Sequence, residues 1–270
     1  MTKKKIFIDP GHGGHDPGAI GAKSKEAENV LKVALALEKK LNAQGYEVRL
    51  SRRTNIYLTL FQRTQLANVW GADIFISLHD NSAVNKTATG FETFIFNGQV
   101  SANTVKLQKS LHDTLIKEIG LRDRGMKRAN FAVIRLTNMP AVLIEYGFVS
   151  NLSDEKVIAF EIEKQAQLTF EGINNYYGIP NKSVSATPTQ KPATAPKTEV
   201  KQESDEIMLT ETGRNEIRAL LKKARNKNYT SNGKEEAIIN PAIHTDAKID
   251  QYSDAQLLSY QAAVINRTFN

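Results

Sequence analysis

The sequence predicts an α/β fold, with a mostly parallel twisted sheet, helices on both faces of the sheet, and a small α-rich C-terminal domain after a linker. Short β-rich runs alternate with apolar helical repeats from Lys5 to about Pro180, which is typical of strands joined by crossover helices. Residues 181–205 then contain almost no large apolar side chains. We therefore expect a domain over 1–180, a flexible linker over 181–205 and a second domain over 206–270.

The elements of the first domain are predicted from periodicity and residue type. Apolar residues at every third or fourth position indicate helices, and β-rich or alternating runs indicate strands. The expected strands are Lys5–Asp9, Tyr46–Ser51, Asp73–His79, Gly90–Phe96, Phe131–Leu136 and Ala141–Phe148. The expected helices are Glu26–Leu41, Leu58–Trp70, Val105–Ile119 and Ser153–Tyr177, the last broken near Ala159. The alternation in Gly90–Phe96 favours an edge or half-exposed strand.

Residues 206–270 carry two helix signals, separated by a loop-rich stretch with room for one short helix or strand. The first helix contains apolar Ile217, Leu220 and Leu221, and Ser253 is an N-cap candidate for the second. The segment is near the lower size limit for a domain that folds alone.

Composition limits the chemistry. The chain has no cysteine and five histidines, so a metal site must use histidine and carboxylate ligands. The net charge of +7 favours an anionic partner. Signatures of nucleic-acid-binding folds are missing, so we expect no nucleic-acid partner. No apolar run reaches the ~18 residues of a membrane span, so we expect no such span. The apolar run after the N-terminal lysines is too short for a signal peptide.

Three candidate site residues lie at the ends of predicted strands or at the start of a helix, where open α/β sheets form their sites. His12 lies in a glycine-rich turn, which is either an ordinary turn or a ligand loop, and lacks the known phosphate-binding patterns. Glu26 opens a helix, where the helix dipole favours an acidic residue without any function, and Glu28 competes with it for a role. His79 ends a buried strand, where a histidine is more often a core residue than a ligand.

Glu145 is the fourth candidate, because it interrupts the apolar run AVLIEYGF. An ionised carboxylate in such a run is unfavourable unless it is paired, hydrogen-bonded or bound to a metal. Burial would raise its pKa toward the range of a general base. The alternative is a buried ion pair with an arginine, for which Arg135 is the candidate.

These motifs, taken together and in order, resemble the zinc-dependent N-acetylmuramoyl-L-alanine amidases of the amidase-3 type, found as bacterial autolysins and phage endolysins. The resemblance spans residues 4 to about 179. The motifs that carry it are IFIDPGHGGHDPGAIG, the helix beginning at Glu26, SRRTN, ADIFISLHDN, RDRGMKRANFAVIRLTNMP and AVLIEYGFVSN. The sequence departs from the family at Asp80, where alanine or histidine is common, and at Val30, where asparagine is usual.

The resemblance implies the roles of the candidate residues. His12, Glu26 and His79 match the Zn²⁺ ligands, and Glu145 matches the catalytic glutamate. Asp9 is expected to orient a ligand histidine, and Arg135 and Asn81 to contact the substrate. The implied reaction is hydrolysis of the amide between N-acetylmuramic acid and L-alanine in peptidoglycan.

Several alternatives stay open at this stage. The enzyme is either a phage endolysin or a sporulation-associated autolysin with the same chemistry, or else a zinc peptidase of wall stem peptides. A catalytically inactive wall-binding protein is a rival from another class. We expect residues 206–270 to bind an anionic wall polymer or to form a homodimer, although their basic helix also fits a solvated surface. We expect synthesis in the bacterial host cytoplasm without a signal peptide, followed by action on the wall after release.

Overall fold

The computed structural model describes residues 3–180, 218, 228–231 and 234–237. The chain divides into two units, Met1–Pro180 and Asn181–Asn270. In the second unit, strands β7 (Asn228–Ser231) and β8 (Lys234–Ala237) form an antiparallel pair, and Arg218 is helical. The predicted linker and the rest of the two predicted C-terminal helices lie outside the described residues.

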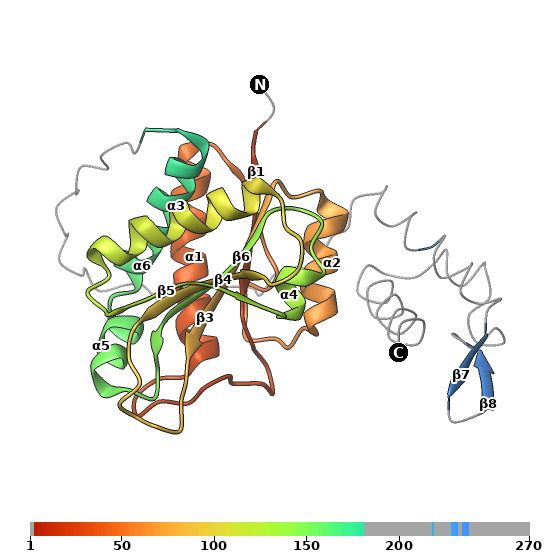
Figure 1. Ribbon diagram of the computed structural model, residues 1–270, viewed down its shortest axis with the longest axis horizontal. Coiled ribbons are helices and arrows are strands. Elements are labelled where there is room, and N and C mark those ends of the chain that lie inside the picture. Colours follow the sequence, from red (N-terminus) through yellow and green to blue (C-terminus); the bar gives the residue numbers. More distant parts are fainter. Residues whose placement is uncertain (1–2, 181–217, 219–227, 232–233, 238–270) are drawn as a thin grey trace, which may run out of the picture. The chain divides into compact units, whose positions relative to one another are not determined.

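The first unit is built on a six-stranded sheet (Figure 1). Its strands are β1 (Lys5–Pro10), β2 (Glu47–Leu50), β3 (Ile74–Asn81), β4 (Phe91–Phe96), β5 (Asp123–Ala129) and β6 (Ala141–Phe148). Their order across the sheet is β2-β1-β3-β6-β4-β5. Strands β2, β1, β3 and β6 are mutually parallel. Strand β4 runs antiparallel to β6, and β5 runs parallel to β4. The expected mostly parallel sheet is confirmed.

Helices cover both faces of this sheet (Figure 1). They are α1 (Glu26–Gln44), α2 (Leu60–Trp70), α3 (Ala102–Glu118), α4 (Ala132–Arg135), α5 (Leu152–Phe160) and α6 (Ile162–Tyr177). Because side chains alternate along a strand, Ile6 and Ile8 pack into the cluster formed with α1, α3 and α6. Phe7, between them, packs with Trp70 of α2 and Val133 of α4 on the other face. None of the described helices is long and apolar enough to cross a bilayer.

Two strand predictions were wrong. The residues 131–136 were expected to form a strand, but they contain the single-turn helix α4, which buries Val133 and Ile134 against the sheet. The strand in this part of the chain is β5, whose sequence DRGMKRA is largely polar and has no buried residue. Because β5 pairs only with β4 at the sheet edge, it needs no apolar pattern. Its presence makes β4 an internal and mostly buried strand, not the edge or half-exposed strand expected from its alternation.

Strand register gathers the polar candidates at one end of the sheet. Asp9 pairs with Ser77 between β1 and β3, and His79 pairs with Glu145 between β3 and β6. β4 begins at the same end, where Glu92 pairs with Glu145. The candidate site therefore lies at one end of the sheet, where the parallel strands finish and where β4 and β5 begin.

Candidate metal centre

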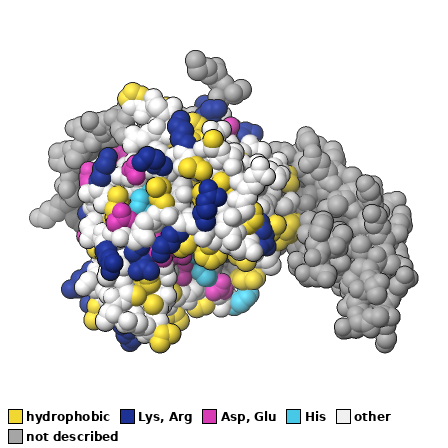
Figure 2. Space-filling model, in the orientation of Figure 1, with side chains coloured by type: hydrophobic (Ala, Val, Ile, Leu, Met, Phe, Trp, Pro, Cys, Tyr) yellow, Lys and Arg dark blue, Asp and Glu magenta, His cyan; other side chains and the backbone are white. Residues whose placement is uncertain are grey.

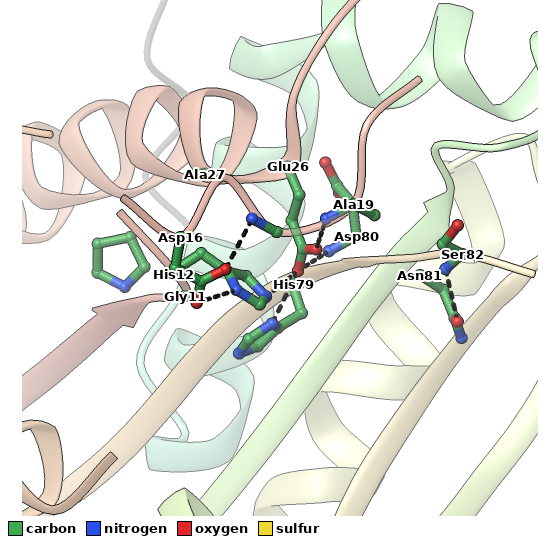
Figure 3. Close-up of polar contacts among 12 residues, drawn as sticks. Gly11, His12, Asp16, Ala19, Glu26, Ala27, His79, Asp80, Asn81 and Ser82 are labelled. Carbon is green, nitrogen blue, oxygen red and sulfur yellow. Dashed lines mark hydrogen bonds and ion pairs between the residues drawn. The ribbon is translucent and has the colours of Figure 1, made fainter. Parts of the chain in front are cut away.

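His12, Glu26 and His79 converge on one point (Figure 3). Their candidate ligand atoms all lie within 4.8 Å of one another. Oε1 of Glu26 is 3.0 Å from Nε2 of His12 and 2.8 Å from Nδ1 of His79. The three residues come from the turn after β1, the first residue of α1 and the end of β3. Two imidazoles and one carboxylate are ligand types that transition metals accept, so this group can hold a metal ion.

Glu26, and not Glu28, takes part in this group. Glu26 is buried, while Glu28 lies at the surface and pairs with Lys25 at 3.5 Å. Burial acts to raise the pKa of Glu26, but hydrogen bonds with the two histidines outweigh it and the pKa is lowered. The backbone N–H of Ala19 also donates to its Oε2 at 2.8 Å. Glu26 is therefore held as a carboxylate.

The turn that carries His12 depends on two glycines. A side chain at Gly11 would collide with the imidazole of His79. Gly18 has φ +65°, and a Cβ there would lie 2.6 Å from Oε2 of Glu26 and 2.7 Å from Cδ2 of His12. His12 itself has φ +58°, an unfavourable backbone region for a residue with a side chain. This strained turn needs support from surrounding groups.

Two buried arginines provide that support. Nη2 of Arg63 donates to the carbonyl of His12 at 2.6 Å, and Nη1 donates to Asp9 at 2.9 Å. Nη2 of Arg52 donates to the carbonyls of Gly11 at 2.6 Å and Ala27 at 2.8 Å. Arg52 therefore ties the His12 turn to the first turn of α1, where Glu26 lies. Neither arginine stands out in the sequence, since Arg52 lies between Ser51 and Arg53, and Arg63 lies between Gln62 and Thr64.

Asp9 acts on the turn in a different way from the one expected. Its carboxylate accepts hydrogen bonds from Arg63, Ser51 and Ser77, at 2.6 to 2.9 Å. Among the described residues it has no hydrogen bond to the ring of His12 or His79. Burial acts to raise the pKa of Asp9, but Arg63 and Ser51 outweigh it and the pKa is lowered. Asp9 anchors Arg63, which in turn holds the His12 backbone.

The carboxylate that contacts a ligand ring is Asp16, which the sequence analysis missed. Oδ2 of Asp16 lies 2.8 Å from Nδ1 of His12. Such a contact fixes the orientation and tautomer of a metal-binding imidazole. Burial lowers the pKa of His12, but contacts with Glu26 and Asp16 outweigh it and raise the pKa. The spacing of four residues between His12 and Asp16 in HGGHD was the available signal.

Glu145 lies beside the triad on β6, opposite His79 in the strand register. Its Oε2 is buried and has no hydrogen-bond partner among the described residues. Burial, followed by the charges of Glu26, Asp80 and Glu92, raises the pKa of Glu145 well above its ordinary value. The alternative of an ion pair with Arg135 is wrong, because Arg135 is exposed and donates to Asn130 at 2.5 Å.

Two further polar residues follow His79 on β3. Asp80 is buried, accepts a hydrogen bond from Asn29 at 3.1 Å, and has a pKa raised well above its ordinary value by burial and by Glu26. Asn81 points away from the triad (Figure 3) and donates to Glu92 at 2.6 Å. The sequence analysis did not single out Glu92.

A cleft of ≈ 320 Å³ adjoins His12 and His79. Its remaining lining is largely apolar and includes Tyr57, Leu58, Leu60 and Val133. Arg135 lies outside this cleft and lines a separate hollow of ≈ 270 Å³ with Asn138 and Met139.

The fold and the site define a class of α/β protein with a His–Glu–His group at the carboxyl ends of its parallel strands. Residues 6–175 match the profile of the N-acetylmuramoyl-L-alanine amidase family, Amidase_3. The chain belongs to this family.

Named relatives agree with this assignment. The sporulation-specific N-acetylmuramoyl-L-alanine amidase of Bacillus subtilis (strain 168) is 46% identical over 152 residues, which cover 56% of this chain and 58% of that protein. The endolysin of Bacillus phage SPP1 is 34% identical over 196 residues, covering 70% and 71%. The catalytic domain of CwlV from Bacillus (Paenibacillus) polymyxa var. colistinus has a TM-score of 0.62 and 35% identity, covering 66% of this chain and 99% of that domain. The chain spans only about three fifths of the sporulation-specific relative.

Proposed function

We propose that residues 1–180 form a zinc-dependent N-acetylmuramoyl-L-alanine amidase domain that hydrolyses the amide between N-acetylmuramic acid and the L-alanine of the peptidoglycan stem. The proposal rests on one observation, the convergence of His12, Glu26 and His79 beside a glutamate with an unpartnered carboxylate oxygen. Three protein ligands of this type, with a fourth position left for water or substrate, are the donor set of catalytic zinc sites.

The chain's own residues supply the proton transfer. His12, Glu26 and His79 would hold the zinc ion, which would supply a Lewis acid for the amide carbonyl and for the attacking water. Glu145 accepts the proton from that water and then delivers it to the leaving amine of L-alanine. Its pKa is raised by burial and by neighbouring carboxylates, which makes Glu145 a stronger base than an exposed carboxylate and suits the acceptance of the proton.

The residues behind the triad position it. Asp16 orients the ring of His12, and Arg63 and Arg52 hold the backbone of the turn. Because reacting groups must be held to within a fraction of an ångström, this network keeps His12 in reach of Glu26 and His79. We assign no substrate contact to Arg135, which lies outside the cleft beside the triad.

Product analysis of digested walls tests the proposal. We expect new free amino groups on L-alanine, together with glycan strands whose muramic acid residues carry free lactyl carboxylates. New amino groups within the stem peptide would support the zinc peptidase instead, and no product from the zinc-loaded protein would support a wall-binding protein. Chelation is expected to stop the reaction, and added Zn²⁺ to restore it.

Two biological roles share this chemistry. A phage endolysin and a sporulation-associated autolysin both degrade the wall of a bacterial cell, and both kinds of protein are among the relatives described above. We favour the endolysin, because that relative matches over 196 residues and shares 71% of its length. A holin-like gene next to the coding sequence would support this choice, and a sporulation operon would support the autolysin.

We propose that the rest of the chain directs the enzyme to the wall. A linker over 181–205 and a binding domain over 206–270 would raise the local concentration of the catalytic domain at an insoluble polymer. The basic residues of the predicted helix, such as Arg214, Lys222 and Lys223, suit an anionic wall polymer. Residues 206–270 fused to a fluorescent protein are expected to sediment with purified Gram-positive walls in low salt. A fusion that stays soluble and dimeric would favour dimerisation instead.

A further inference from the structure

A buried carboxylate holds two cations next to Glu145. Glu92 is 3% exposed and lies opposite Glu145 across β4 and β6. Its Oε2 accepts a hydrogen bond from Nε of Arg124 at 2.9 Å and forms an ion pair with Lys127. Its Oε1 accepts from Asn81. We call Glu92, Arg124 and Lys127 the β4–β5 cluster; one negative and two positive groups leave it with a net charge of +1.

The β4–β5 cluster lies on the same side of the sheet as Glu145. Thr93 faces the opposite side, since its hydroxyl contacts His112 of α3. Alternation along β4 therefore directs Glu92 toward the side on which Leu143 and Glu145 lie. Arg124 is near the start of β5, so the cluster belongs to the same edge of the sheet as the metal centre.

The two cations are held in place while remaining accessible. The guanidinium of Arg124 lies 4.7 Å from the ring centroid of Phe148, and the ammonium of Lys127 lies 5.8 Å from that of Phe94. Their side chains are 29% and 36% exposed. In residues 3–180, Nη2 of Arg124 donates to no protein atom. Figure 2 shows Lys and Arg side chains gathered beside acidic ones at the lower left of the domain.

We propose that Arg124 and Lys127 bind a carboxylate of the stem peptide on the leaving-amine side of the scissile bond, so that the enzyme selects acidic peptides. This inference rests on the proposed amidase function. A guanidinium and an ammonium fixed side by side recognise a carboxylate through charge-assisted hydrogen bonds. Uncharged glycan offers these cations no such partner, whereas an acidic peptide does.

The span between the two sites fits a short peptide. Neighbouring strands lie about 4.8 Å apart, so β5 is roughly 10 Å from β6 across the sheet. An extended peptide covers about 3.3–3.6 Å per residue. A carboxylate on the second or third residue after the cut can therefore reach Arg124 while the scissile amide lies at Glu145. The apolar cleft beside His12 remains for the muramoyl side.

Paired substrates test this assignment. We would measure kcat and KM on a muramoyl tripeptide with free carboxylates and on two analogues, amidated either at the second residue or at the third, C-terminal residue. We expect the wild type to favour the acidic substrate, through KM, by on the order of tenfold, and one of the two analogues to show which carboxylate binds. Arg124→Gln and Lys127→Met should each remove most of that preference while leaving kcat on the amidated analogue nearly unchanged.

A matched control is available on the same strand. Arg128 is exposed on β5 and adjacent to Lys127, so its side chain points to the opposite side of the sheet. Arg128→Gln should keep the preference for the acidic substrate. If the wild type cuts all three substrates equally well, or if the two variants lower kcat equally on all of them, the β4–β5 cluster only supports the fold and the inference is wrong.

A failure of the proposed amidase function can be distinguished from a failure of the proposed subsite. Binding of the acidic and amidated stem peptides to zinc-loaded Glu145→Gln protein can be followed by calorimetry, without turnover. Tighter binding of the acidic peptide, lost in the double variant with Lys127→Met, supports the subsite even if the scissile bond has been misassigned. Equal affinities for the two peptides would overturn it.

Discussion

The two sides of the candidate site differ in how fully their polar groups are satisfied. On the β1 side, Asp9, Arg52 and Arg63 are buried and each makes several hydrogen bonds. The two arginines donate to backbone carbonyls of the His12 turn, and Asp9 anchors Arg63. On the β6 side, Glu145 has a buried oxygen without a partner. Full satisfaction makes a rigid support, and a missing partner keeps a carboxyl group reactive. Under the proposed function, the first side would hold the metal ligands and the second would carry out proton transfer.

Loss of a ligand should have the largest effect. We expect His79→Ala to lose stoichiometric zinc and all measurable turnover, because two ligands rarely retain the ion at such a site. Zinc content by mass spectrometry and release of dye-labelled wall fragments measure the two effects. His112→Ala is the control, since His112 contacts Thr93 and Asp123 away from the triad. Full zinc occupancy and activity in His79→Ala would refute the ligand assignment.

Glu145→Gln should separate chemistry from metal binding. We expect it to keep its zinc and its fold while kcat falls by about 10²–10⁴-fold, the usual effect of losing a general base. In the wild type, the acidic limb of the pH–rate profile should lie above the ordinary glutamate pKa, since burial and the neighbouring carboxylates raise the pKa of Glu145. Near-normal turnover in the variant would leave Glu145 with only a structural role.

Much of this arrangement was predictable from the sequence, with a few exceptions. The apolar runs of β1, β3 and β6 gave the central strands, and Glu145 was noticeable because it interrupts such a run. β5 was missed because an edge strand with charged side chains needs no apolar pattern. Arg63 and Glu92 were missed because their roles depend on partners far away in the sequence, such as Asp9, 54 residues before Arg63. Asp16 was missed although its partner His12 is close in the sequence.

The buried Arg63–Asp9 pair on the β1 side should contribute to the free energy of unfolding. Arg63→Met removes the partner of buried Asp9, and leaving a buried charge unpaired typically costs about 3–5 kcal/mol. The pKa of Asp9 is lowered below its ordinary value of 3.8 in the folded state. The contribution of Asp9 to the free energy of unfolding is therefore fully present above pH 3.8. It is lost as the pH falls through the lower pKa of the folded state.

Denaturant unfolding at several pH values measures this contribution. The difference in the free energy of unfolding between wild type and Arg63→Met should be largest near neutral pH and should become smaller below pH 3.8. Lys109→Met is the matched control, because the Lys109–Asp113 pair is 65% and 44% exposed, and pairs of this kind contribute little. A gap that does not change with pH would mean that Arg63 stabilises the fold through packing and not through Asp9.

Removal of residues 181–270 should have the smallest effect on both sides of the site. All of the site residues, and the six strands that position them, lie within residues 3–180. Helix α6 ends with its own cap, in which the backbone N–H of Gly178 donates to Asn175 and that of Ile179 donates to Asn174. We expect the 1–180 fragment to fold, to bind zinc, and to cleave a small soluble muramoyl peptide within about twofold of the full-length rate, because a tether matters only for an insoluble, repeated substrate. A fragment that is unfolded, or that loses activity on the small peptide as well as on intact walls, would show that residues 181–270 complete the catalytic domain and do not only deliver it.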